Sequence, residues 1–169
     1  LWFMPVANPD GYDFTFTEGN RLWRKNTREF NGEPGTTIGD GVDPNRNFAV
    51  KWGYDNEGSS PDPASDTYRG TGPNSEPETQ AMVGLLDRIG FAFQVNYHSN
   101  GQWLLYAEGW QTSTPTADDP IYYAMSGNLD DPAIAEFHPG LSSDVLYVTN
   151  GETTDYAHAV TGALAWTPE

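Results

Sequence analysis

The stretch SEPETQAMVGLLDRIGFAFQVNYHS, residues 75–99, decides the fold class. Its first half predicts a helix, because apolar residues recur there at helical spacing, namely Met82, Leu85, Leu86 and Ile89. Ser75-Glu76-Pro77-Glu78 matches a capping box, with proline tolerated in the first helical turn. Gly90 is typical of a residue that ends a helix. We therefore expect one well-delimited helix immediately before residue 91.

The second half of the stretch predicts a strand over 91–98, because its aromatic and β-branched residues alternate. Working outward, apolar runs predict further strands at 102–106, at 163–167 and at Leu1–Ala7, the last of them buried. Helix starts are indicated near 116–119 and at 154–155, the latter helix ending at Gly162. Strands that alternate with helices are typical of an α/β domain.

Composition limits the function classes. The chain has 169 residues, no cysteine and a formal net charge of −16. Disulfides and thiolate metal sites are thus excluded, and nucleic acid is an unfavourable partner because its phosphates would be repelled. No apolar run reaches 18 residues, so no membrane span is expected.

Positive charge is concentrated in one part of this acidic chain. Five of the eight basic residues fall between positions 21 and 46: Arg21, Arg24, Lys25, Arg28 and Arg46. A cationic cluster in an anionic protein indicates a site for a negatively charged group. Pairing with nearby acids such as Glu29 and Glu33 explains the cluster equally well.

Two ionisable residues follow predicted strands. His98 ends the strand at 91–98, and Glu169 follows the last apolar strand. Ligands of open α/β sheets bind beyond the carboxyl ends of strands, and neutral imidazole is a common zinc ligand. A hydrogen-bonded structural histidine is the alternative for His98 taken alone.

Several short motifs, read together in chain order, are more specific. They are Asn8-Pro9-Asp10-Gly11-Tyr12, Asn20-Arg21-Leu22-Trp23-Arg24-Lys25-Asn26, Gly41-Val42-Asp43-Pro44-Asn45-Arg46-Asn47-Phe48, Tyr68-Arg69-Gly70, Ser75-Glu76-Pro77-Glu78 and His98-Ser99, with Tyr147, Asp155 and Glu169 beyond them. This order resembles the carboxypeptidase A/B family of zinc exopeptidases over nearly the whole chain. The resemblance implies an α/β fold, part of a central mixed β-sheet flanked by helices, in a single domain.

The resemblance also assigns catalytic roles residue by residue. His98 matches the third zinc ligand, and Glu169 the general base that activates a zinc-bound water. Arg24 matches the arginine that polarises the scissile carbonyl and stabilises the oxyanion. Such a site would hydrolyse the C-terminal peptide bond of peptides or proteins.

Further residues match the family's substrate contacts. Asn45 and Arg46 correspond to the pair that grips the free C-terminal carboxylate, Tyr147 to the tyrosine that closes over it, and Arg21 to an accessory arginine. The loop after Tyr147 corresponds to the pocket for the departing side chain. There Glu152 could select Lys or Arg, Thr154 would leave a neutral pocket, and an exposed loop acid is the alternative for Glu152.

One part of the family pattern is missing. No His-x-x-Glu occurs, although it would supply the other two ligands of a single Zn²⁺ ion, so both are expected upstream of Leu1. Residues 1–169 thus read as a partial catalytic domain that on its own binds zinc poorly and is essentially inactive. Asp43 fits, because its family counterpart orients the first zinc-binding histidine.

Other functions stay open at this point. A catalytically inactive binding module on the same fold would keep the arginines without the zinc ligands. A deacylase or amidase acting on small acidic or cell-wall peptides would use the same chemistry, and a carbohydrate-active protein would use the tryptophans and acids. For the peptidase, the resemblance implies peptide or protein C-termini as partners, a monomer and an extracellular, secreted location.

Overall fold

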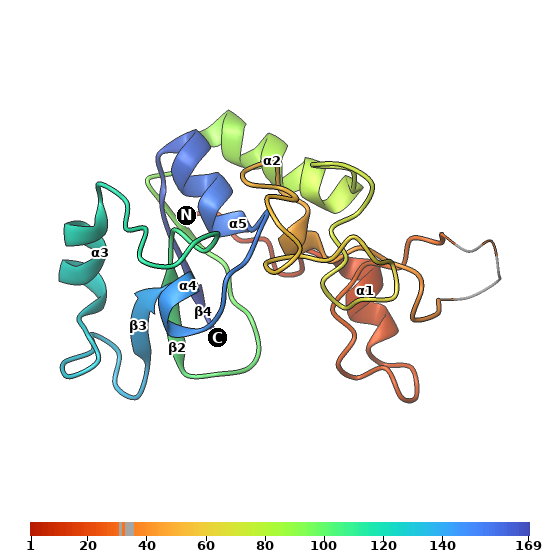
Figure 1. Ribbon diagram of the computed structural model, residues 1–169, viewed down its shortest axis with the longest axis horizontal. Helices are drawn as coiled ribbons and strands as arrows, with labels where there is room; N and C mark the ends of the chain where they lie inside the picture. The colour runs from red at the N-terminus through yellow and green to blue at the C-terminus, as the bar shows by residue number, and fades with distance from the viewer. Residues whose placement is uncertain (31, 33–35) are drawn as a thin grey trace.

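The computed structural model describes residues 1–30, 32 and 36–169. Glu33, considered above as a partner of the arginines, lies outside these residues. The strands form one four-stranded sheet with the order β1-β4-β2-β3, which lies in one half of the molecule (Figure 1). The strands are β1 (Phe93–Val95), β2 (Trp103–Tyr106), β3 (His138–Leu141) and β4 (Leu164–Pro168). Because β4 is parallel to β1 but antiparallel to β2, the sheet is mixed.

Helices cover both faces of this sheet (Figure 1). On one side α2 (Pro77–Ile89), α5 (Thr153–Tyr156) and the π-helical turn η2 (Ala157–Thr161) share a buried apolar cluster with β4 that includes Leu86, Ala157 and Ala165. On the other, α3 (Asp119–Ser126) places Tyr122 against Trp166. Ala165 and Trp166 are adjacent in β4, so their side chains point to opposite faces, and each face has its own core.

The predicted fold class is confirmed: a mixed central sheet with flanking helices in a single domain. The helix before residue 91 runs from Pro77 to Ile89, and Gly90 ends it in the left-handed conformation at φ 64°. Three predicted strands are observed with shorter or shifted bounds, as β1, β2 and β4. The helical segment expected to end at Gly162 is observed as α5 followed by η2.

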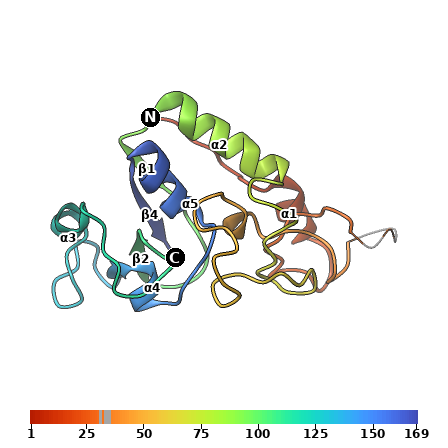
Figure 2. The same cartoon turned by 45° about the horizontal axis from the view of Figure 1, so that its top comes forward.

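The prediction of a buried strand at Leu1–Ala7 is wrong. These residues have no helix or strand assignment, and the side chains of Leu1, Trp2 and Phe3 are exposed. Apolar composition alone does not form a strand, because the backbone groups also need a neighbouring strand. Figure 2 shows this N-terminal stretch running beside α2 toward α1.

The capping box at Ser75 is also wrong. The N-cap of α2 is Glu76, whose side chain does not cap the helix. The Ser75 hydroxyl instead donates to the Glu76 carboxylate at 2.6 Å and accepts from Asn47 Nδ2 at 3.0 Å. These contacts with a neighbouring loop replace the local cap.

Four short elements were not predicted: α1 (Pro9–Phe14), the 3₁₀ turn η1 (Pro44–Arg46), α4 (Ser142–Val145) and β3. The Asn8 side chain caps α1, and the Asp43 side chain caps η1. None of the helices in the described part of the chain is long and apolar enough to cross a bilayer.

Candidate active site

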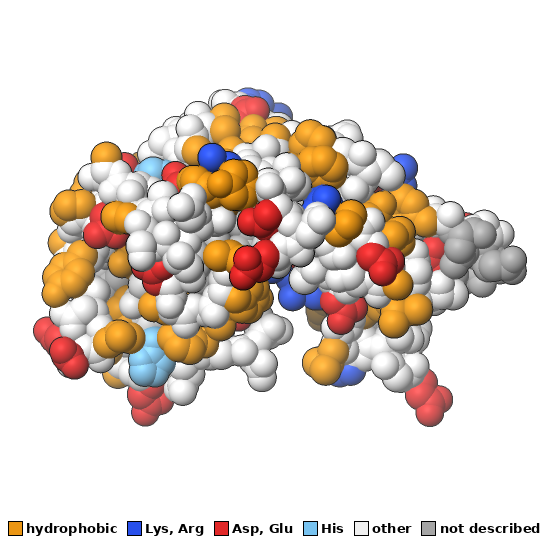
Figure 3. Space-filling view, viewed as in Figure 1, with side chains coloured by type: hydrophobic (Ala, Val, Ile, Leu, Met, Phe, Trp, Pro, Cys, Tyr) orange, Lys and Arg blue, Asp and Glu red, His pale blue; other side chains and the backbone are white. Residues whose placement is uncertain are grey.

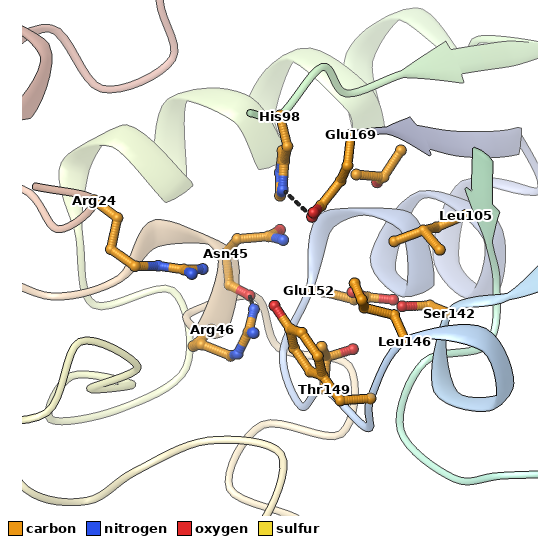
Figure 4. Close-up of a pocket in the computed structure, with 12 residues that line it drawn as sticks. Arg24, Asn45, Arg46, His98, Leu105, Ser142, Leu146, Thr149, Glu152 and Glu169 are labelled. Carbon is orange, nitrogen blue, oxygen red and sulfur yellow. Dashed lines mark hydrogen bonds and ion pairs between the residues drawn. The ribbon is translucent and has the colours of Figure 1, made fainter. Parts of the chain in front are cut away.

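The ends of two neighbouring strands bring His98 and Glu169 together. β1 and β4 are parallel, and the His98 backbone N–H donates to Pro168 O at 2.9 Å, which continues their pairing past β1. The His98 ring Nδ1 lies 3.1 Å from Glu169 Oε1 (Figure 4). Residues 71 positions apart in sequence thus share one edge of the sheet, as the strand-end argument predicted.

Hydrogen bonding holds the His98–Glu169 pair. The other ring nitrogen, Nε2, lies 3.0 Å from Asn96 Nδ2. The hydrogen bond with His98 lowers the pKa of the Glu169 carboxyl, partial burial opposes this shift, and the charges of Arg24 and Arg46 reinforce it. Glu169 is thus a carboxylate at neutral pH and can accept a proton.

Asp43 links Arg24 to the turn η1. Its Oδ2 lies 2.8 Å from Arg24 Nη2, and its Oδ1 accepts from the Asn45 N–H at 3.0 Å. Asp43 is only 2% exposed, whereas the Arg24 side chain is 38% exposed. The Asp43 carboxylate raises the pKa of the Arg24 guanidinium, and Tyr147 adds to the effect. Arg24 is therefore fixed at one end and accessible to a ligand.

Arg46 is the most unusual charge in the site. Its side chain is 2% exposed, yet it forms no ion pair with any acid in the described part of the chain. Its Nη1 donates to the Asn45 carbonyl at 2.7 Å, while its Nε has no hydrogen-bond partner there. A buried guanidinium without an anion is costly, so this arrangement favours an anionic ligand.

Asn45 presents its amide N–H groups to the same space. Its Oδ1 accepts from the Thr153 N–H at 3.0 Å and from the Thr153 hydroxyl at 2.8 Å. These two bonds fix the side-chain orientation and join η1 to α5. The Nδ2 group is left as a donor beside Arg46.

One hollow collects most of the predicted site residues. It contains about 270 Å³ of empty space, part of it open to solvent. Seven of the nine predicted site residues line it: Arg24, Asn45, Arg46, His98, Tyr147, Glu152 and Glu169. In the space-filling view the molecule is deeply indented between the sheet half and the loop half, with Lys or Arg atoms beside the indentation (Figure 3).

The other two predicted residues lie outside this hollow. Arg21 places its guanidinium 5.4 Å from the centre of the Phe16 ring. Thr154 is 2% exposed and buried within α5. Within the cationic cluster, Arg28 pairs with Glu76 at 2.8 Å, an acid distant in sequence and not the neighbouring Glu29. Arg24 and Arg46 line the hollow, and Arg24 also pairs with Asp43.

Glu152 is not an exposed loop acid, so that alternative is wrong. It is 4% exposed and lines the hollow beside Leu105 and Leu146. The sequence analysis named its neighbour Asp155 as part of the family pattern but gave it no role in the site; Asp155 is 1% exposed. The available signal was the spacing, because residues i and i+3 share one side of a helical turn.

The described residues fit a zinc ion only in part. His98 is an imidazole at the hollow, but no group of three His, Cys, Asp or Glu residues in the described ranges could hold a metal. Catalytic zinc sites use three protein ligands. A complete site would therefore need ligands beyond those described.

Comparisons with known proteins agree with this geometry. A family model described as zinc carboxypeptidase matches residues 1–169. A metallocarboxypeptidase A-like protein from Trichophyton verrucosum (strain HKI 0517) is 37% identical over 92% of this chain, and carboxypeptidase B from Helicoverpa zea is 36% identical over 98%. The matches cover 37% and 40% of those proteins, so the chain spans about two fifths of the length of these curated relatives.

Solved structures give the same result. The crystal structure of carboxypeptidase A from Helicoverpa armigera superimposes with a TM-score of 0.80 and 32% identity, covering 98% of this chain and 41% of that one. Bovine thrombin-activatable fibrinolysis inhibitor, solved in complex with tick carboxypeptidase inhibitor, superimposes with a TM-score of 0.78 and 28% identity, covering 98% of this chain and 56% of that one.

Proposed function

Because this chain belongs to the zinc carboxypeptidase family, we propose that its hollow is the substrate side of an active site that removes the C-terminal residue from peptides and proteins. The observation that carries the proposal is the buried Arg46 guanidinium, which has no ion-pair partner among the described residues. A free C-terminal carboxylate would supply that anion. Arginine suits it because its planar fork can donate two parallel hydrogen bonds.

Binding of the carboxylate would define exopeptidase action. Asn45 would add the N–H donors that its bonds to Thr153 leave free, and Tyr147, which lines the same hollow, would cover the bound group. A peptide bond in the middle of a chain presents no carboxylate there. The site would therefore act only at chain ends.

The hydrolytic step would use groups on either side of the scissile bond. Glu169 would take a proton from the attacking water and pass it to the leaving amine. Arg24 would stabilise negative charge on the carbonyl oxygen, and its bond to Asp43 fixes the guanidinium beforehand. We assign His98 as one ligand of a Zn²⁺ ion, with the other two supplied upstream of Leu1 in a longer protein.

The substrate side-chain pocket would be the part of the hollow lined by Glu152, Leu105 and Leu146. Thr154, buried in α5, and Arg21, outside the hollow, would act through their neighbours. The family resemblance supports an extracellular, monomeric enzyme, of which residues 1–169 are part of the catalytic domain.

Hydrolysis of matched peptides tests the proposed function in the full-length protein. A peptide with a free C-terminus should lose its last residue, whereas the same peptide with a C-terminal amide should not. Arg46→Met should lower kcat/KM for the free peptide by about 100-fold or more, because a charge-assisted hydrogen bond is lost.

Arg88→Met is the matched control, because Arg88 is exposed near the end of α2. It should retain activity within about twofold, as expected for a surface change away from the site. Equal cleavage of the amidated and free peptides, or full activity of Arg46→Met, would contradict the proposal.

A further inference from the structure

Two buried acids lie at the start of α5, and one of them, Glu152, lines the hollow. Glu152 is the N-cap of α5, and Asp155 lies in its first turn, three residues later. Residues at this spacing face the same side of a helical turn. Their exposed fractions are 4% and 1%, so both carboxyl groups are shielded from bulk water.

Both carboxyl groups contact the same glycine. Asp155 Oδ1 accepts from the Gly109 N–H at 2.9 Å. A Cβ atom at Gly109 would collide with the Glu152 carboxyl group and with the Thr149 hydroxyl. The absence of a side chain at Gly109 thus leaves the space in which the acids meet.

Within the described ranges, the two acids have no cationic partner. Neither acid takes part in the ion pairs found among the described residues. Glu152 Oε1 and Asp155 Oδ2 are buried, and no donor in the described part of the chain reaches them. Two adjacent buried carboxylates without a counter-charge repel each other, so retention of one proton is favoured.

The electrostatic surroundings agree with a retained proton. Burial raises the pKa of Asp155 well above its usual value, Glu152 raises it further, and the bond from Gly109 opposes the shift. Glu108 adds a smaller repulsion, and the buried Tyr122 phenol also lies in the field of Asp155. None of these groups can neutralise two negative charges.

The two acids hold different positions relative to the hollow. Glu152 lines it, whereas Asp155 lies behind Glu152 and is not among the lining residues. We propose that Asp155 is a positioning residue for substrate selectivity: it shares a proton with Glu152 and holds that carboxyl toward a cationic C-terminal side chain, lysine or arginine. This inference rests on the proposed carboxypeptidase function.

The shared proton makes selectivity depend on pH. As pH rises through the raised pKa of Asp155, the charge of the pair changes from −1 to −2, which strengthens attraction of a cationic side chain. A leucine side chain gains nothing from this change. Ionisation changes elsewhere in the active site would affect both kinds of peptide, so they cancel when the two kcat/KM values are expressed as a ratio.

The test measures kcat/KM for two peptides that differ only in a C-terminal Lys or Leu, using the full-length protein between pH 5.5 and 8.5. The wild-type Lys/Leu ratio should exceed one and rise with pH. Glu152→Gln should lower the ratio by at least about tenfold, because the cationic side chain loses its counter-charge. At the lowest pH Asp155→Leu should lower the ratio, because the donor that orients Glu152 is lost.

Asp155→Asn separates positioning from a merely structural role. Its amide oxygen can still accept from Gly109, and its amide N–H can still donate to Glu152. The ratio at the lowest pH should therefore stay within about threefold of wild type, but its rise with pH should disappear. Glu108→Gln is the control for general negative charge: it should leave the ratio nearly unchanged at the lowest pH and shift its rise only slightly, toward lower pH.

The outcomes separate the two proposals. Failure to hydrolyse either peptide would overturn the carboxypeptidase function and this inference with it. Hydrolysis of both peptides with a ratio at or below one, or an unchanged pH dependence in Asp155→Asn, would overturn the inference alone. So would an equal loss of selectivity in Glu108→Gln and Glu152→Gln.

Discussion

Lys25 and Lys51, the only two lysines in the sequence, occupy opposite environments. Lys25 is fully buried, and its Nζ donates to Ile38 O at 3.0 Å and to Pro63 O at 2.7 Å. It thereby ties two loops to the segment that carries Arg24. Lys51 is exposed, and its Nζ lies 3.7 Å from the centre of the Trp110 ring.

We expect Lys25→Met to lower the free energy of unfolding by about 2–3 kcal/mol, because it leaves two carbonyl groups without their donor. Lys51→Met should cost about 1 kcal/mol or less, the value of an exposed cation–π contact. Urea denaturation of both variants measures the difference. Equal losses would show that Lys25 does not hold the two loops together.

At the residue scale, the strand ends were the most readable part of the site. Two strands with polar residues directly after them were enough to predict that His98 and Glu169 lie at the sheet edge. The partners of individual charged residues could not be predicted from the sequence. Arg28 and Arg46 look alike in sequence, yet one pairs with Glu76 and the other has no acid partner among the described residues. That difference depends on loops far apart in the chain.

At the element scale, one glycine lies within α2 and a second one ends it, and the two adopt different backbone conformations. Gly84 lies within the helix, and a Cβ atom there would meet open space. Gly90 ends the helix at φ 64°, where a Cβ atom also meets no neighbour within 4 Å. Any difference between alanine substitutions at these positions therefore reflects backbone conformation and not packing.

Gly84→Ala should stabilise the protein by about 0.5–1 kcal/mol, because alanine loses less backbone entropy on folding. Gly90→Ala should destabilise it by about 1 kcal/mol, because alanine is strained in the left-handed region. Thermal unfolding of the two variants checks the signs. A stabilising Gly90→Ala would contradict the observed helix end.

Elements with strong local signals were predicted well, and elements that depend on pairing were not. α2 has helical periodicity and a glycine stop, so its predicted and observed ends nearly agree. β3 reads His138-Pro139-Gly140-Leu141, a composition that disfavours strands. It forms because β3 is the outermost strand of the sheet and pairs with β2 alone. At an edge, proline's missing N–H is tolerated.

At the scale of the whole molecule, the N-terminal apolar residues are not buried. Leu1, Trp2 and Phe3 are 105%, 61% and 82% exposed. β1 is the other outermost strand of the sheet, and its Phe93 and Val95 side chains are 54% and 49% exposed. Sequence patterns indicate burial but do not say what covers a surface, which is why the prediction at Leu1–Ala7 was wrong.

The metal site could not be predicted from local sequence patterns either, because a complete site needs groups that converge from several segments. Of the three histidines, His98 lines the hollow, His158 contacts Asp118 at 3.2 Å and His138 packs against Trp103. A single imidazole cannot supply the binding energy of three ligands. Zinc affinity therefore tests whether residues 1–169 hold a complete site.

Isothermal titration of residues 1–169 with zinc should give a dissociation constant weaker than about 1 μM, since no group of three ligand residues comes together in the described part of the chain. Excess Mg²⁺ would suppress weak binding to the acidic surface, which carries a formal net charge of −16. Any remaining heat should disappear in His98→Ala and persist in His138→Ala. A submicromolar site abolished by His98→Ala would mean that this chain supplies ligands besides His98, and the expectation of two upstream ligands would then be wrong.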